Sequence, residues 1–273
     1  KFWFRLAVLS SCVVGAWAQP AAPTATPTPK PSALDAVLFY QILLGELNTR
    51  QGSPGSGFSL MLDAARKTRD PALFQRSVDM ALQARSGEAA LQAAQTWKRE
   101  IPSATEANRY LLQILLALNR VNEAGQALSV SIRELPAAEQ NDAIASVPRI
   151  FARVQDKKMA ADTVEKALAF ALKQPKTAAT AWTTIGRMRR EAGQLALAVE
   201  AVRQGHTADP MSQGPLILAL SIAGDAPAEI HPLLKQAMDG RVPPELRLAY
   251  ARHLISLPQP VEALRQLTRL NTE

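Results

Sequence analysis

The stretch from Ala181 to Pro210 constrains the fold more than any other, because it reads as one complete helix-turn-helix unit. Its small residues Gly186 and Ala198 are placed where two antiparallel helices would cross closely. Gly193 frees the backbone for the turn between them, and Asp209-Pro210 stops the second helix. A chain with such a unit is expected to repeat it.

The same unit recurs upstream. The stretch from Ala107 to Pro136 has the same length and aligns without a gap, with Ala124 in the place of Ala198 and Pro136 at the stop. Ala90 lies 34 residues before Ala124, which is the period of a known class of helical repeats. From Pro136 to Pro210 is 74 residues, two such periods plus six, so the intervening unit is expected to carry a longer helix or loop.

Looser units fill the remainder of the chain. Near the beginning, Gly45 is expected in a first helix and Ala64 in a second, with the glycine-rich segment 52–57 as their turn. Near the end, turns are expected at 223–225 and 256–258. Only 5% of the residues are aromatic, and the abundance of Ala, Leu, Gln and Arg favours helices. We therefore predict an all-α solenoid of about seven antiparallel helix pairs over residues 34–273, in which each pair buries its apolar face on its neighbours.

These units resemble the tetratricopeptide repeat, which asks for large, small and stop residues at fixed offsets. Two positions depart from it: Arg189 stands where the family has an aromatic residue, and Val202 is smaller than the usual Phe. The positions that carry the resemblance are Trp182, Ile185, Gly186, Ala198 and Pro210.

The N-terminal segment has the layout of an export signal. Residues 1–18 carry basic residues, an apolar run and the small-residue ending Ala16-Trp17-Ala18, which predicts cleavage after Ala18 and delivery to the periplasm. The alternative is a lipoprotein signal ending at Cys12, which would anchor the chain in the outer membrane. Residues 19–33 read as a disordered tether rich in Pro, Thr and Ala. No later apolar run is long enough for a transmembrane helix in the mature chain.

The sequence gives little sign of catalysis. Three histidines, His206, His231 and His253, stand in different units without metal-ligand spacing, and neither a nucleophile motif nor a phosphate-binding loop occurs. The formal charge is +7, but the basic residues are spread over helix faces without interleaved aromatics, which argues against nucleic acid as a partner. We expect a non-enzyme without cofactor or metal, whose partners are proteins or peptide segments.

The expected binding surface is the concave side, which the first helix of each pair lines. Arg187 and Arg190 lie one turn apart and can hold a carboxylate or a backbone carbonyl of an extended or acidic segment. The alternative is that these arginines only keep the face soluble. The predicted binding residues are Arg109, Gln113, Leu116, Thr183, Arg187 and Arg190.

A narrower resemblance concerns the segments 43–52 and 61–84, including Thr68-Arg69-Asp70-Pro71. They resemble the N-terminal region of periplasmic tetratricopeptide lipoproteins that act as adaptors of carboxyl-terminal processing proteases. The resemblance implies a scaffold that binds such a protease and brings it cell-wall hydrolases, and it implies acylation on a cysteine. The alternative function is an assembly factor for envelope, pilus or secretion machinery.

Overall fold

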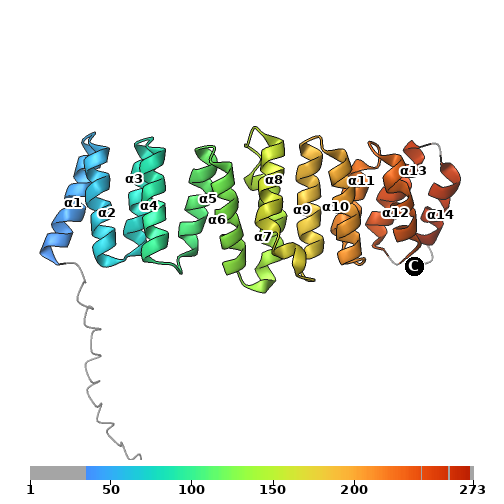
Figure 1. Cartoon of the computed structure of the whole chain (residues 1–273), viewed down its shortest axis with the longest axis horizontal. Coiled ribbons are helices and arrows are strands. Elements are labelled where there is room, and N and C mark those ends of the chain that lie inside the picture. Colours follow the sequence, from blue (N-terminus) through green and yellow to red (C-terminus); the bar gives the residue numbers. More distant parts are fainter. Residues whose placement is uncertain (1–34, 241, 258, 271–273) are drawn as a thin grey trace, which may run out of the picture.

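A computed structural model describes residues 35–240, 242–257 and 259–270. Over these residues the chain is helical throughout, and its helices form a single elongated row from α1 at one end to α14 at the other (Figure 1). The helices are α1 (Ala36–Arg50), α2 (Pro54–Thr68), α3 (Pro71–Gln83), α4 (Gly87–Glu100), α5 (Thr105–Ala117), α6 (Val121–Glu134), α7 (Ala137–Ile150), α8 (Lys157–Leu168), the 3-10 helix η1 (Ala171–Lys173), α9 (Ala178–Glu191), α10 (Leu195–Ala208), α11 (Gln213–Ile222), α12 (Pro227–Asp239), α13 (Pro244–Ser256) and α14 (Pro260–Leu270). The prediction of an all-α solenoid of about seven helix pairs is confirmed.

The pairs stack in two layers. In the central and C-terminal part of the row, each odd-numbered helix from α7 to α13 packs on the next odd-numbered helix, and α6 packs on α8 as α10 does on α12. Consecutive pairs are therefore side by side, and each pair contacts only its neighbours, as in tetratricopeptide-like solenoids. The odd layer carries the face that the sequence assigns to ligands.

Four of the pairs share the same turn. Three residues connect α1 to α2, α3 to α4, α5 to α6 and α9 to α10, and the middle one has a positive φ. In the last turn, Gly193 donates its N–H to Arg190 O and Gln194 donates to Arg189 O, which satisfies carbonyls at the end of α9. The middle residues are Gly52, Arg85, Asn119 and Gly193. The predicted turn at Gly193 is confirmed.

The close crossing of α9 and α10 is also confirmed. Gly186 and Ala198 are both buried, and a Cβ at Gly186 would lie 3.1 Å from the Cβ of Ala201 and overlap Leu218 of α11. The small residues therefore let three helices approach one another. The helix stops predicted at Pro136 and Pro210 are confirmed, because α6 ends at Glu134 and α10 at Ala208.

Of two further predictions, the turn at 52–57 is only partly correct and the longer unit after Pro136 is confirmed. The glycine-rich segment 52–57 is only partly a turn, because Pro54 opens α2 and Gly57 lies inside it, where α2 crosses α1 at Gly45. Proline is favoured at the first position of a helix, which explains why α2 begins so early. The longer unit after Pro136 is confirmed: six residues join α7 to α8, and η1 follows α8.

The core falls into two apolar clusters, one running from α2 to α9 and the other from α10 to α14. In the first, the buried Trp97 stacks on Phe74 with ring centroids 6.3 Å apart and also contacts Tyr110. The other landmarks Ala64, Ala90 and Ala124 are fully buried, while Trp182 is half-buried beside Gly205.

No described helix combines the length and apolar character needed to cross a bilayer. The predicted signal segment 1–18, the tether 19–33 and Cys12 lie outside the described residues.

Candidate protein-binding face

The candidate face is the exposed side of the odd layer from α5 to α9. On α5, Arg109 and Gln113 are exposed and Leu116 is half-buried. On α9, Arg187 and Arg190 are exposed. These five predicted residues are available to a partner, and their role in binding remains a prediction.

Thr183 is the exception, and its prediction as a binding residue is corrected. Its side chain is buried, and its hydroxyl donates to Ala179 O at 2.8 Å. A Cβ at Gly214 of α11 would lie 2.8 Å from the Thr183 hydroxyl, so the two helices meet at this point. Thr183 therefore serves the packing of α9 on α11.

The five residues do not form one compact cluster, because α7 lies between α5 and α9. The buried residues Ile144 and Val147 of α7 have the spacing of Ile185 and Met188 in α9. In this register, the exposed Asp142 takes the place of Thr183. Helix α7 thus fills the middle of the face.

Arg149 of α7 takes the place of Arg190 and is exposed. Sequence reasoning missed Asp142 and Arg149, because the longer unit obscured the register of α7. The signal that could have found them is the spacing of Ile144 and Val147, which repeats that of the better unit. The face carries both signs of charge, since Glu191 is exposed next to Arg190.

The arginines on the face differ from those between the helices. Arg189, which takes the aromatic position of the repeat, is buried and donates to Asp162 at 2.5 Å, to Glu165, and to Gln194 at 2.8 Å. Burial alone would lower the pKa of Arg189, but the hydrogen bonds to the two carboxylates raise it, so the guanidinium stays charged. Among the described residues, neither Arg187 nor Arg190 has a carboxylate partner. Their N–H donors are open to a ligand.

A cleft of about 240 Å³ adjoins the face at its α5 end. It lies between the first turns of α5 and the last turns of α6, and Glu106 and Arg109 stand at its rim. The Arg109 guanidinium is 5.9 Å from the ring centroid of Tyr110. This cleft is a hollow in the surface beside the charged face.

Two of the histidines lie close together, although they belong to different units of the repeat. The rings of His231 on α12 and His253 on α13 have centroids 5.4 Å apart. Burial lowers the pKa of His253, and the neighbouring His231 lowers it further. Within the described ranges, no three His, Cys, Asp or Glu side chains are grouped as metal ligands would be.

No family model matches the chain, and neither does any curated protein. Several solved structures of helical repeat proteins are similar to it at low identity. A type IV pilus biogenesis factor, PilW, is 16% identical over 85% of this chain and all of its own, with a TM-score of 0.34. The C-terminal part of a TPR repeat-containing protein from Cytophaga hutchinsonii is 13% identical over 85% of this chain and 95% of its own, with a TM-score of 0.41. At this level of similarity, the partners and roles of those proteins do not transfer to this chain.

Proposed function

We propose that this chain is a non-catalytic scaffold that binds an extended segment of another protein along the odd layer of its solenoid. The observation that carries the proposal is the pair Arg187 and Arg190, exposed one turn apart on α9 without a carboxylate partner among the described residues. Paired guanidinium groups can hold a carboxylate or main-chain carbonyls through parallel N–H donors. Stacked helix pairs extend such a contact over several units, which suits an extended segment.

The specific partner we propose is a periplasmic carboxyl-terminal processing protease, with a cell-wall hydrolase as the second protein that the scaffold brings to it. The support is the resemblance of segments 43–52 and 61–84, which lie in α1 to α3 and their connections. The proposal includes export by the N-terminal segment, with cleavage after Ala18 and delivery to the periplasm; the alternative is acylation on Cys12, which would anchor the chain in the outer membrane.

The test has two parts. The full-length tagged chain is crosslinked in envelope extract, and the captured proteins are identified together with the chain's own N-terminus. Recovery of a processing protease and of a wall hydrolase, and faster hydrolase cleavage when the purified chain is added, are the expected results. Recovery of pilus or secretion components, without any effect on cleavage, would replace the adaptor function by an assembly function.

The second part tests the face itself. Replacing Arg187 and Arg190 by Glu should weaken binding of the captured partner at least tenfold, with unchanged helical content by circular dichroism. The matched control replaces the exposed Arg153 and Arg203, on the α7–α8 connection and on α10, by Glu. This control makes the same change of charge away from the face and should leave affinity unchanged. Equal affinity of both variants would remove the arginine pair from the binding site.

A further inference from the structure

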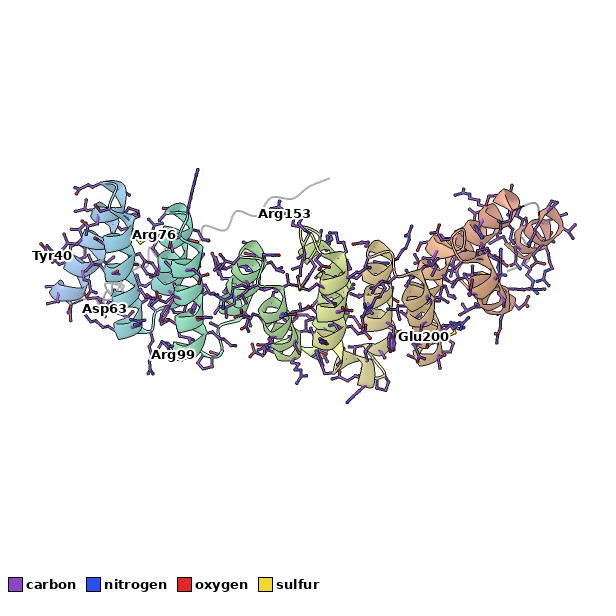
Figure 2. All side chains as sticks on the ribbon, turned by 45° about the horizontal axis from the view of Figure 1, so that its top comes forward. Tyr40, Asp63, Arg76, Arg99, Arg153 and Glu200 are labelled. Atoms are coloured by element: carbon purple, nitrogen blue, oxygen red, sulfur yellow. The ribbon has the colours of Figure 1, made fainter. Side chains whose placement is uncertain are left out.

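The outer face of α1 is apolar, although α1 forms one end of the described row of helix pairs (Figure 1). Tyr40 is 61% exposed, and Leu43 and Leu47 are each 41% exposed. Spacings of three and four residues place these three side chains on one stripe of the helix. Figure 2 shows Tyr40 directed away from the row at this end of the molecule.

The other sides of α1 are already occupied. Gln41 and Gly45 are buried toward α2, and the amide of Gln41 donates to Leu60 O at 3.0 Å. Glu46 accepts two hydrogen bonds from Arg76 of α3, at 2.6 and 2.7 Å, and these bonds lower the pKa of Glu46. Helix α1 is therefore firmly docked on the solenoid, and the apolar stripe lies on the side opposite α2.

An apolar stripe in this position is unusual for a solenoid. Terminal repeats need a polar outer face to remain soluble, because no further repeat covers them. The stripe of Tyr40, Leu43 and Leu47 has instead the pattern of a helix-packing seam. A second helix laid along it would exclude water from this apolar surface over about two turns.

The sequence of α1 is complementary to itself in the antiparallel direction. Leu43 is the midpoint of the helix, so a twofold axis at Leu43 sets this residue against its own copy. The same axis places Tyr40 level with residue 46 of the second copy, one residue from Leu47, so the two side chains lie side by side. Every apolar side chain of the stripe then meets another apolar side chain.

The ends of the helix add charge complementarity. Asp35 is the N-cap of α1 and Arg50 is its last residue, and both are exposed. They lie on the same flank of the stripe, because fifteen residues correspond to about four turns. In the antiparallel arrangement, Asp35 comes within one residue of the level of Arg50 of the second copy at both ends, and the helix dipoles oppose each other favourably.

We infer that the outer face of α1 binds a second copy of this chain, as an antiparallel α1–α1 pair about a twofold axis. One helix from each side buries an area at the lower end of specific protein interfaces, so association is expected in the micromolar range. The interface leaves the odd-layer face from α5 to α9 uncovered. The dimer would present two such faces and raise the effective affinity for a partner with two binding segments.

The experiment uses the full chain with Cys12, its only cysteine, replaced by Ser. In this background, Leu43→Cys is compared with Leu264→Cys on α14, an apolar residue that is also exposed, at the far end of the row. Under mild oxidation, Leu43→Cys should form a covalent dimer with itself, because the two Cα atoms meet at the axis within disulfide range. Leu264→Cys should stay monomeric.

A disulfide that forms only in a mixture of the two variants would overturn the inference, because it would indicate head-to-tail association of α14 on α1. Sedimentation equilibrium of the unmodified chain gives the second measurement. A concentration-dependent dimer that Leu43→Glu weakens at least 100-fold, with unchanged circular dichroism, is expected. The control Ile255→Glu, at an exposed residue of α13, should leave association unchanged. A monomer at all concentrations up to 200 μM or so, well above the association expected for this size of interface, would overturn the inference and leave the stripe to another occupant.

Discussion

Helices α9 and α10 pack closely on each other, whereas α7 and α8 have little contact with each other and pack on other helices. A three-residue turn with Gly193 at its centre joins α9 to α10, and Gly186 lets the two helices cross closely. Six residues join α7 to α8, and none of them has a positive φ. The position of two consecutive helices in the row can therefore be fixed either by the turn and the close crossing between them or by their contacts with neighbouring helices.

The neighbours of the longer unit supply those contacts. The hydroxyl of Thr184 on α9 donates to Ile144 O of α7 at 3.1 Å, and this hydrogen bond is buried within the odd layer. Arg189 of α9 reaches Asp162 and Glu165 of α8. Helix α9 thus holds α7 by a hydrogen bond and α8 by an ion cluster, while it holds α10 by close packing.

The largest effect is expected at the close crossing. Gly186→Val adds side-chain atoms where Ala201 and Leu218 already fill the space, so we expect a loss of about 2–3 kcal/mol in the free energy of unfolding. Urea titration followed by circular dichroism measures it. Gly224→Ala is the matched control, since no atom lies within 4 Å of the added Cβ. A loss below 0.5 kcal/mol or so for Gly186→Val, the size of an ordinary surface change, would contradict the role of the small residues.

A smaller effect is expected at the ion cluster. Arg189→Met keeps the apolar stem but leaves Asp162 and Glu165 without their cation, which should cost about 1–2 kcal/mol. Both carboxylates are more than a third exposed, so water compensates part of the loss. Hydrogen exchange should increase in α8 more than in α10. Arg190→Met, at an exposed residue of the same helix, should change neither stability nor exchange.

The smallest effect is expected at the turns, and it has the opposite sign. Arg85 occupies the left-handed position that Gly193 occupies in α9–α10, with φ of 53°. Arg85→Gly should therefore raise the free energy of unfolding by about 0.5–1 kcal/mol, because glycine adopts this conformation without steric cost. Gly193→Ala should lower it by a similar amount. Thermal unfolding of the two variants side by side gives the sign, and a destabilised Arg85→Gly variant would contradict the shared turn geometry.

The sequence predicted the parts of the fold that depend on local chemistry. Gly193, Pro136 and Pro210 mark turns and stops through their own backbone preferences, and the structure has them in those places. The left-handed turns at Arg85 and Asn119 escaped notice, because neither residue requires this conformation. Their position is imposed by the helices on either side, which no single residue reveals.

The candidate face was predictable in part for a related reason. Arg187 and Arg190 follow from the period of the helix, and they are exposed. Thr183 obeys the same period but is buried, because the approach of α11 depends on Gly214 in a different unit. The pairing of Arg189 with Asp162 and Glu165 depends on contacts between units as well. Helical periodicity predicts the direction in which a side chain points. It does not predict which residues of a neighbouring helix contact that side chain.

The six-residue connection between α7 and α8 is also the place where this chain should best tolerate an insertion. A three-residue turn such as 192–194 is closed by main-chain hydrogen bonds at fixed spacing, so an added residue would break it. Ala152 and Arg153 are exposed on the longer connection, and Arg153 stands at the surface in Figure 2. An inserted loop, epitope or whole domain is tolerated best at such a site. A graft between the exposed Ala152 and Arg153 would leave the buried Phe151 and Val154 of the same connection in place.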